Sequence, residues 1–324
     1  MLRPDVPAVI LAPMEGVTDA PMRAVQGVGG AFTFAVTEFL RVSQQVPPRH
    51  VYHDHMPELR TGGRTLTGLP VQLQLLGGDA GRMAEAAARG HELGAAAIDI
   101  NFGCPAPTVN RHDGGAALLR HPKRIREIVA AVRAAVPAAV PVSAKLRLGW
   151  DGIDAIDENA AMAAEGGASG LTIHGRTRVA GYAPPVFWAP IGRVRERLGL
   201  PVVANGDIST LDGVRRCREE TGCVHFMLGR GALADPRLAH QVAAELGIAP
   251  APDAEFGPFD WLPPLRSLVE WTARFHDDAR PHKTLCRLKQ WLKTAATVGT
   301  FARFDAVKRA ASVEDLFAAL ESAV

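Results

Sequence analysis

The amino-acid sequence predicts a (β/α)8 TIM barrel with a C-terminal α-helical domain. Short β-branched or apolar segments alternate with segments of helical periodicity, such as residues 80–94, 125–136 and 211–220. Strands that alternate with helices pair in parallel, and eight such units in about 240 residues favour a closed barrel over a doubly wound sheet. The eight expected strands are residues 8–13, 34–39, 71–76, 97–101, 142–148, 170–175, 202–206 and 224–229.

The C-terminal quarter has a different composition. Residues 247–264 hold five prolines and predict a linker. Apolar residues at helical spacing beyond it predict three helices. We therefore expect a barrel catalytic domain over residues 1–245, and a linker with a helical domain over residues 246–324. The three expected helices are residues 265–277, 282–295 and 313–323.

The overall composition is that of an ordinary soluble protein, with 47% hydrophobic and 22% charged residues among 324. No apolar run approaches the ~20 residues that cross a bilayer. The apolar N-terminal stretch is too short for a signal peptide and lacks a small-residue cleavage site. We expect a cytoplasmic monomer without membrane contact.

The cysteines and histidines do not predict a metal site. Four cysteines, Cys104, Cys217, Cys223 and Cys286, are scattered without a C-x-x-C pair, which argues against a disulfide framework and a structural zinc. The histidines within residues 49–55 fit no metal-ligand spacing, so we expect a solvated loop there.

Polar and glycine-rich residues accumulate where the expected strands end, which is where barrel enzymes build their sites. Glycines follow the seventh and eighth strands, with Asn205 and Arg230 beside them. The loops after these strands commonly hold phosphate. Gly206, Gly229 and Gly231 are equally compatible with tight turns, but the neighbouring Asn205 and Arg230 favour a phosphate site.

Lys145 lies at the end of the fifth strand, where alternation directs it into the barrel mouth. A buried lysine needs a partner or a lowered pKa. It could form a Schiff base, as in an aldolase, or stabilise an anion such as a reduced flavin, unless it is simply a surface lysine.

A lone histidine such as His174 is more often packed than functional, although Arg176 two residues later favours function.

Cys104 is held on a loop between Gly103 and Pro105, directly after the fourth strand. A structural thiol would normally lie among apolar neighbours within an element. The loop position favours catalysis, as a nucleophile or as a proton donor.

The segment 280–293 carries five basic residues and no acidic one. On a helix, Leu285, Leu288 and Leu292 would form an apolar stripe with the basic residues on other sides. The pattern fits a solvated helix face or a contact with a nucleic-acid backbone.

Seven segments occur in a characteristic order and spacing. They are LAPMEGVTD (11–19), TEF (37–39), NFGCPAPTVNRHDGGAALL (101–119), SAKLRLGW (143–150), IHGRT (173–177), ANGDI (204–208) and LGRGAL (228–233). This series resembles the tRNA-dihydrouridine synthase family over most of residues 8–236, and the helical tail resembles that family's RNA-binding domain. EFLRV, VSAKLRLGW and CRLKQWL are most similar to the bacterial C-type enzymes, which act at U16 of the D-loop.

The resemblance implies FMN in the barrel mouth, NADPH as reductant, and reduction of the C5–C6 double bond of a tRNA uridine to 5,6-dihydrouridine. Lys145 would stabilise the reduced flavin and Gln74 would hydrogen-bond its ring. Asn205, Gly206, Asp207, Gly229 and Arg230 would bind its phosphate end. The other implied flavin contacts are Pro13, Met14, Glu15 and His174.

The resemblance also gives Cys104 a role. Hydride from the flavin reaches C6, and C5 takes a proton from the other face, which a positioned thiol can supply. The uridine must leave its stack, as loop bases do readily. Asn101 and Arg147 would hold it, and the tRNA backbone would meet Arg41, Lys283, Arg287, Lys289 and Lys293.

Three other functions share some of these features. A dihydroorotate-type FMN dehydrogenase shares the flavin loops and the reduction of a small pyrimidine, but has no need of the basic tail. A Schiff-base aldolase would use Lys145 and the phosphate site. In an RNA-binding protein without catalysis, Cys104 and the flavin loops would be surplus.

Overall fold

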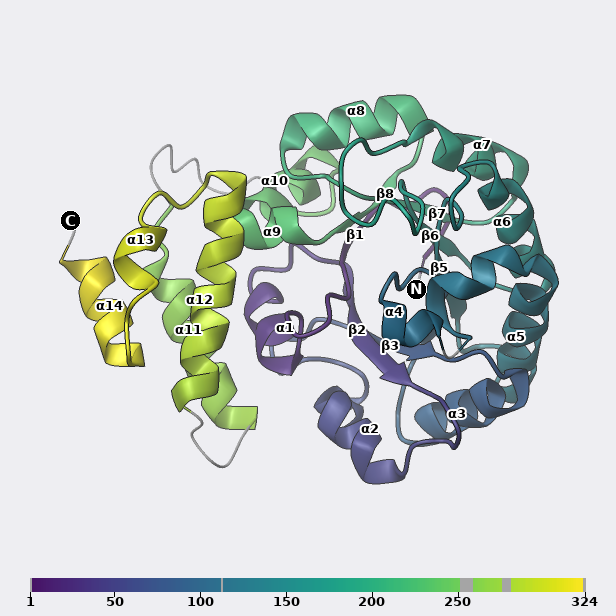
Figure 1. The fold of residues 1–324 in the computed structure, drawn as a ribbon, viewed down its shortest axis with the longest axis horizontal. Coiled ribbons are helices and arrows are strands. Elements are labelled where there is room, and N and C mark those ends of the chain that lie inside the picture. The colour runs from purple at the N-terminus through teal and green to yellow at the C-terminus, as the bar shows by residue number, and fades with distance from the viewer. Residues whose placement is uncertain (1, 112, 251–258, 276–280, 323–324) are drawn as a thin grey trace.

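Eight parallel strands close into a barrel in the order β1 to β8, which confirms the predicted fold (Figure 1). The computed structural model describes residues 2–111, 113–250, 259–275 and 281–322. Each strand pairs with the next one along the chain, and β8 pairs with β1. The strands are β1 (Ala8–Leu11), β2 (Phe34–Arg41), β3 (Val71–Leu76), β4 (Ile98–Asn101), β5 (Val142–Arg147), β6 (Leu171–His174), β7 (Val202–Asn205) and β8 (His225–Leu228).

Helices surround the barrel because each carries one apolar face. In the helix after β3, Met83, Ala86, Ala87 and Gly90 are buried, and Asp79 caps its first turn. The α-helices are α1 (Ala20–Gln26), α2 (Arg49–His55), α3 (Ala80–Glu92), α4 (Pro107–Asn110), α5 (Pro122–Ala135), α6 (Ala155–Glu165), α7 (Ala189–Arg197), α8 (Leu211–Thr221), α9 (Arg230–Ala234) and α10 (Arg237–Glu245). Two 3-10 turns are η1 (Pro57–Thr61) and η2 (Gly115–Arg120).

The segment 49–55 forms helix α2, so the predicted solvated loop is wrong. Tyr52 is fully buried and its hydroxyl donates to Ala86 O at 3.0 Å. The ring of His55 lies 2.7 Å from Glu38 O through Nε2. These contacts to α3 and β2 order a segment whose histidines alone suggested exposure.

The interior of the barrel has an apolar and a polar half. Side chains that point outward from the strands pack against the helices, as alternation requires. Of those that point inward, the apolar ones come from β1, β2, β7 and β8: Ala8, Ile10, Phe34, Val36, Val203 and Met227. The opposite half, from β3 to β5, is polar: Gln72, Gln74, Asp99, Asn101, Ser143 and Lys145.

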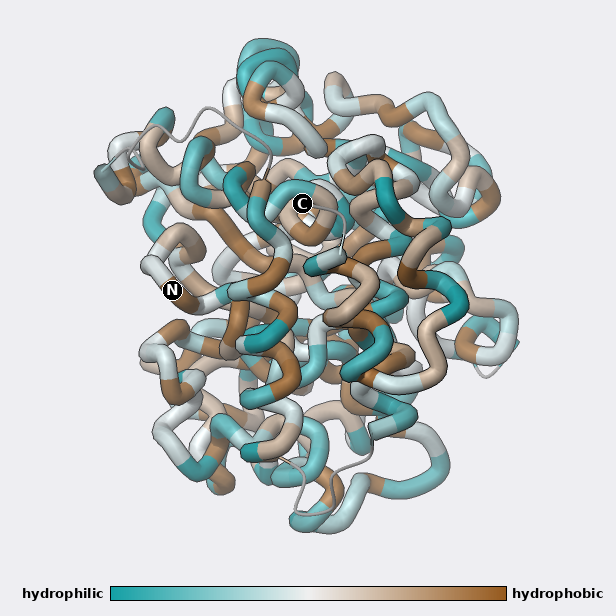
Figure 2. Tube along the Cα trace, turned by 90° about the vertical axis from the view of Figure 1, so that its left-hand side faces the viewer, coloured by the Kyte–Doolittle hydropathy of each residue, from teal (hydrophilic) through white to brown (hydrophobic). Residues whose placement is uncertain are grey.

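The C-terminal helices pack on one side of the barrel, beside α1 and α9 (Figure 1). They are α11 (Leu262–Phe275), α12 (Pro281–Val298), α13 (Phe304–Val307) and α14 (Val313–Glu321). One apolar cluster joins Met22 of α1 and Leu233 of α9 to Trp261, Leu288 and Trp291. Figure 2 looks onto these helices and shows their brown apolar segments beside teal hydrophilic ones.

The three predicted C-terminal helices are confirmed within the described residues. The predicted segments at residues 276–277 and 323 lie outside them. The apolar stripe of Leu285, Leu288 and Leu292 is buried, as expected from its spacing. Helix α13 was not predicted, because four residues are too few for a periodic signal. The division at residue 245 remains a prediction, although α10 does end at Glu245.

Within the described residues, no helix has the length and apolar character needed to cross a membrane.

Candidate active site

Parallel pairing brings the predicted barrel residues to one rim, where the carboxyl ends of the strands meet. Gln74 and Lys145 lie within β3 and β5. The strand-terminal residues are Arg41, Asn101, Arg147, His174 and Asn205. The residues that follow a strand end are Pro13, Met14, Glu15, Cys104, Gly206, Asp207, Gly229 and Arg230.

The loop that carries Cys104 is anchored from both sides. Asn101 Oδ1 accepts hydrogen bonds from the backbone N–H groups of Gly103 and Cys104, each at 2.9 Å. Arg147 Nε donates to Gly103 O at 2.8 Å. Gly115 has φ +59°, and a Cβ there would lie 3.1 Å from Cys104 Cβ, so the glycine lets the following turn close against the loop.

The thiol of Cys104 is partly exposed at the barrel mouth. Burial raises the pKa of this thiol above its ordinary value, and the nearby cations Arg147 and Lys145 oppose the shift. No histidine is among the groups that shift it. The site therefore keeps Cys104 protonated near neutral pH, which suits a proton donor better than a nucleophile.

Lys145 points into the barrel, where its Nζ lies 3.3 Å from Asn205 Oδ1. Asn205 is held in turn by a bond from its Nδ2 to Met227 O at 2.9 Å. Burial lowers the pKa of Lys145 to about 8, reinforced by Arg147 and opposed by Asp99. The ammonium form still predominates at pH 7, so Lys145 presents a positive charge to the mouth.

A polar network lies beneath the mouth, and the sequence did not single out its centre, Asp99. Gln74 Nε2 donates to Asp99 Oδ2 at 2.7 Å, and Ser143 Oγ donates to Asp99 Oδ1 at 2.5 Å. Burial raises the pKa of Asp99, while Ser143, Gln74 and Lys145 lower it. The available signal was a carboxylate between two isoleucines of the buried strand AIDIN, since an unpaired charge is not tolerated there.

Tyr182 is a second residue that the sequence did not indicate, because it lies in a loop without a motif. Its ring is 58% exposed and lies 5.2 Å from the guanidinium carbons of both Arg147 and Arg230. Its ring centroid is 6.2 Å from that of His174, edge to face. An exposed ring between two cations at the mouth can receive a planar ligand by stacking.

Asp207 is engaged by two arginines rather than open to a ligand. Its carboxylate pairs with Arg176 and, at 2.9 Å, with Arg230. The hydrogen bond from Arg176 holds the pKa of Asp207 below its usual range. A carboxylate repels phosphate, so Asp207 fits the role of holding Arg230 in place better than direct contact with an anion.

The mouth holds buried polar groups without a partner. Among the described side chains, His174 Nδ1 and Arg176 NH1 are buried without a hydrogen-bond partner. Burial in a cationic setting lowers the pKa of His174 well below its ordinary value, so the ring is neutral. Unpartnered buried polar groups are costly, which indicates a polar ligand. These groups fit the polar ring edge and the anionic tail of FMN.

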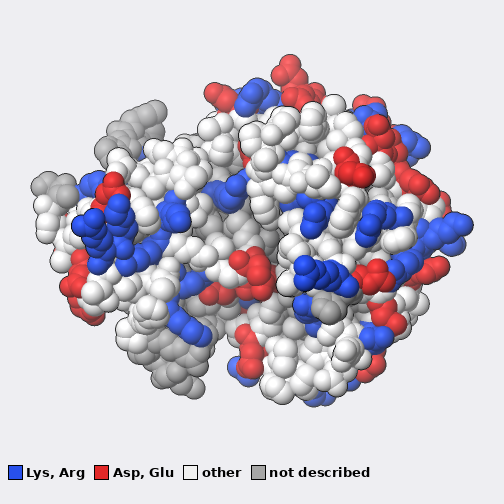
Figure 3. All heavy atoms as spheres, in the orientation of Figure 1, with Lys and Arg blue, Asp and Glu red and all other residues white. Residues whose placement is uncertain are grey.

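The predicted tRNA contacts fall into separate groups. Asn101 and Arg147 are buried in the mouth, and exposed Arg41 donates to Thr108 O at 3.4 Å. On α12, Lys283 and Lys293 are exposed. Figure 3 shows basic side chains on the C-terminal helices and on the barrel, with acidic ones between them.

Two of the four α12 cations are used inside the protein. Arg287 donates to Gly16 O and Val17 O and pairs with Asp19 at 2.7 Å, so it joins α12 to the loop after β1. Lys289 Nζ donates to Ala310 O at 2.6 Å. The structure therefore leaves Lys283 and Lys293 as the α12 residues best placed for an external anion.

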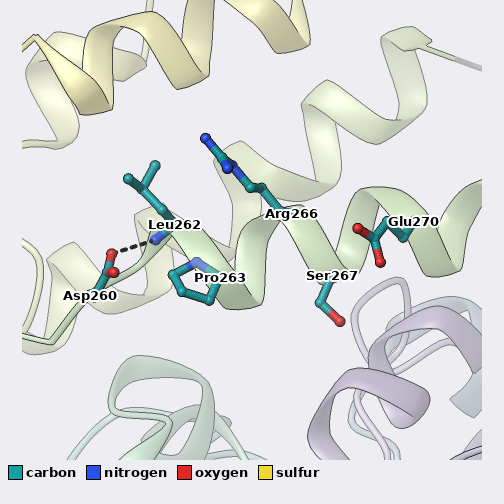
Figure 4. A pocket seen from close by; sticks show the side chains of 6 residues that line it. All are labelled: Asp260, Leu262, Pro263, Arg266, Ser267 and Glu270. Atoms are coloured by element: carbon teal, nitrogen blue, oxygen red, sulfur yellow. Dashed lines mark hydrogen bonds between the residues drawn. The ribbon is translucent and has the colours of Figure 1, made fainter.

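A hollow of about 430 Å³ lies along α11, away from the mouth (Figure 4). Arg266 is its one cation among the lining residues and already pairs with Glu321 at 2.6 Å. The acidic side chains present make it a poor site for a phosphate. The lining residues are Asp260, Leu262, Pro263, Arg266, Ser267 and Glu270.

Comparisons with known proteins show the family to which the chain belongs. The family model "Dihydrouridine synthase (Dus)" matches residues 10–292. A tRNA-dihydrouridine(16) synthase of Shewanella oneidensis is 44% identical over 283 residues, covering 87% of each chain. One of Neisseria meningitidis serogroup B is 39% identical over 323 residues, covering 97% of this chain and 94% of the relative.

Among solved structures, histamine dehydrogenase from Rhizobium sp. 4-9 superposes with a TM-score of 0.55 at 16% identity. The match covers 74% of this chain and 46% of that one, and it supports the barrel fold alone. The family model and the similarity over nearly the whole length place the chain more closely: it belongs to the dihydrouridine synthase family.

Proposed function

We propose that this enzyme reduces the C5–C6 double bond of U16 in tRNA to 5,6-dihydrouridine, with FMN in the barrel mouth and NADPH as reductant. The observation that carries the proposal is the anchored loop of Cys104 beside a mouth with unpartnered buried polar groups. Two relatives named for position 16 support that position, and the Neisseria meningitidis one matches over 97% of this chain.

The flavin would be held by residues from several strands. Gln74 would hydrogen-bond its ring and Lys145 would place a positive charge beside it. Arg230, held by Asp207, would face its phosphate together with Asn205, Gly206 and Gly229. Pro13, Met14, Glu15 and His174 would complete the contacts. Bound FMN would supply the hydride for C6 of the uridine.

Cys104 would donate its proton to C5 of the same ring. The raised pKa keeps the thiol protonated until substrate arrives, and partial exposure lets solvent return the proton after each turnover. Arg147 and Asn101 would hold the extruded base, with Tyr182 offering a stacking surface. The reaction adds one hydride and one proton, so the atoms and charges balance.

The tRNA backbone would lie across the C-terminal helices and the barrel rim. Lys283, Lys293 and Arg41 would contact phosphates, with Arg287 and Lys289 supporting the surface from within. In this proposal residues 1–245 form the catalytic domain and residues 246–324 the linker and tRNA-binding domain. The protein would act as a monomer in the cytoplasm.

The proposal is tested by following the visible band of oxidised flavin without oxygen. NADPH is added to bleach the band, followed by tRNA that lacks dihydrouridine. We expect rapid return of the band, little return with tRNA carrying cytidine at position 16, and dihydrouridine in the product. A bleached flavin that ignores tRNA would favour a small-molecule dehydrogenase, and absence of flavin would contradict the proposal.

A further inference from the structure

We infer that Asp99 is a positioning residue: an acceptor oxygen of its side chain sets the orientation of two side-chain amides, Gln74 and Asn101, and through them the backbone of the Cys104 loop. The inference concerns the placement of Cys104, and its link to catalysis rests on the proposed function. Asp99, Gln74 and Asn101 are 2%, 0% and 8% exposed, so solvent does not compensate for a misplaced group.

The chain of hydrogen bonds has a direction. Asp99 Oδ2 accepts from Gln74 Nε2 at 2.7 Å, which leaves Gln74 Oε1 facing the next amide. Gln74 Oε1 accepts from Asn101 Nδ2 at 2.8 Å. Asn101 Oδ1 is thereby turned to the loop, where it accepts from the N–H groups of Gly103 and Cys104 at 2.9 Å each.

Each step depends on the one before it. A carboxylate only accepts hydrogen bonds, so Gln74 must present its NH2 group to Asp99. The Gln74 carbonyl then requires the NH2 group of Asn101. Reversal of either amide would put two acceptors or two donors in contact at a buried site, which is costly. The loop N–H groups in turn require an acceptor, and Asn101 Oδ1 is the one that they meet.

Asp99, at the end of this hydrogen-bonded series farthest from the Cys104 loop, is also anchored. Ser143 Oγ donates to the second oxygen, Asp99 Oδ1, at 2.5 Å, and Gln72 Nε2 donates to Ser143 Oγ at 2.9 Å. Asp99 therefore receives donors on both oxygens. Its position beneath the mouth, paired in register with Ser143 of β5, keeps it away from the reacting atoms.

The donor–acceptor direction of these hydrogen bonds can be reversed by exchanging the carboxylate at position 99 and the amide at position 101. In Asp99→Asn/Asn101→Asp, the new amide at position 99 donates to Gln74 Oε1, and Gln74 Nε2 donates to the new carboxylate at position 101. The other oxygen of that carboxylate accepts from the loop N–H groups, while Ser143 still donates to position 99. In Asn101→Asp alone, two carboxylates compete for the single NH2 group of Gln74. Asp99→Asn alone can be satisfied by donating to Ser143 Oγ.

The test measures the loop without using catalysis. In the flavin-loaded protein carrying Cys286→Ser, we would measure the alkylation rate of Cys104 by peptide mass spectrometry, together with the midpoint of thermal unfolding. We expect Asn101→Asp to raise the alkylation rate about tenfold and lower the midpoint. Adding Asp99→Asn should return both close to the parent values, and Asp99→Asn alone should change little.

The control is Asn159→Asp. Asn159 is a buried asparagine that takes no part in the hydrogen bonds between Asp99 and the Cys104 loop, and it donates to Leu119 O at 3.0 Å. Asp99→Asn should not reverse its effect. If Asn101→Asp does not fold, recovery of folded protein by adding Asp99→Asn supports the inference in the same way. A double variant no better than the sum of its parts, or an unaffected Asn101→Asp, would overturn it. These readouts leave the proposed reaction untouched, since neither involves tRNA or NADPH.

Discussion

The positive charges of the barrel mouth and those of α12 differ in burial and in hydrogen bonding. In the mouth, Arg147 is 3% exposed and donates to backbone carbonyls of three loop residues, Gly103, Thr177 and Gly181. On α12, Lys283 and Lys293 are exposed, and neither side chain makes a hydrogen bond or ion pair with another described residue. A rigid cation recognises a ligand of one shape, whereas a flexible one recognises charge. We therefore assign chemistry and base recognition to the mouth, and backbone attraction to α12.

The largest expected effect separates the two regions directly. Cys104→Ala should reduce turnover on tRNA by about 10²–10⁴-fold, because a general acid typically contributes that much. Flavin content, NADPH oxidation and tRNA affinity should remain, since these depend on other residues. Single-turnover flavin reoxidation and a tRNA binding titration would measure the two sides. Cys286→Ala, which removes the exposed cysteine of α12, is the matched control and should leave turnover intact. Equal turnover in the two variants would remove Cys104 from the reaction.

Replacing Lys145 tests whether its buried positive charge lowers the free energy of unfolding. Its folded pKa of about 8 lies below the ordinary 10.5, so between these values the unfolded chain binds more protons. The free energy of unfolding of the flavin-free protein should therefore rise from about pH 8 to 10.5. At pH 7 the free energy of unfolding of Lys145→Met should exceed that of the parent by about 1–3 kcal/mol, and it should no longer rise between pH 8 and 10.5. The variant should also bind reduced flavin roughly tenfold more weakly. Urea denaturation at several pH values measures the first effect. A pH dependence identical to that of the parent would show that Lys145 is not the titrating group.

The α12 surface is tested by charge reversal. Lys283→Glu/Lys293→Glu should weaken tRNA binding about tenfold at moderate salt and reduce the slope of log Kd against log salt by roughly 1.5–2. Turnover at saturating tRNA should stay near the parent value. Arg266→Glu on α11 serves as the control for a charge change on the same group of helices. Unchanged affinity in the α12 variant would move the tRNA backbone to another face.

Replacing Arg287 should have the smallest effect, and the effect should be on stability rather than on tRNA binding. It ties α12 to Gly16, Val17 and Asp19, so Arg287→Ala should lower the midpoint of thermal unfolding by a few degrees. The salt slope of tRNA binding should remain that of the parent, because Arg287 makes its contacts inside the protein. Salt titrations of Arg287→Ala and Lys283→Ala side by side would decide. A drop of about 1 in the slope for Arg287→Ala would return it to the tRNA surface.

Much of the fold followed from local patterns. Each of the eight expected strand segments matches a strand of the barrel to within two residues at either end, because buried strands leave short apolar or β-branched segments that end at glycine or polar residues. The buried stripe of α12 followed from the spacing of its leucines. Cys104 was identified as a candidate from its position on a loop at a strand end, and the structure places it at the rim where the other strand ends converge.

The partners of individual side chains could not be predicted in this way. Arg287 and Lys289 read as a cationic face, yet the structure gives them carbonyl and carboxylate partners from distant parts of the chain. Segment 49–55 read as solvated, yet Tyr52 and His55 anchor it as α2. Tyr182 carried no motif at all.

The sequence by itself therefore determined the barrel, the rim on which the site lies and the family to which the chain is similar. Periodicity and strand ends are local properties, written in neighbouring residues. Only the tertiary structure decided which cations remain exposed and which donors lack a partner. It also decided that Asp99 directs the amides beneath Cys104. Those outcomes depend on contacts between strands far apart in sequence, whose register and burial no local pattern records.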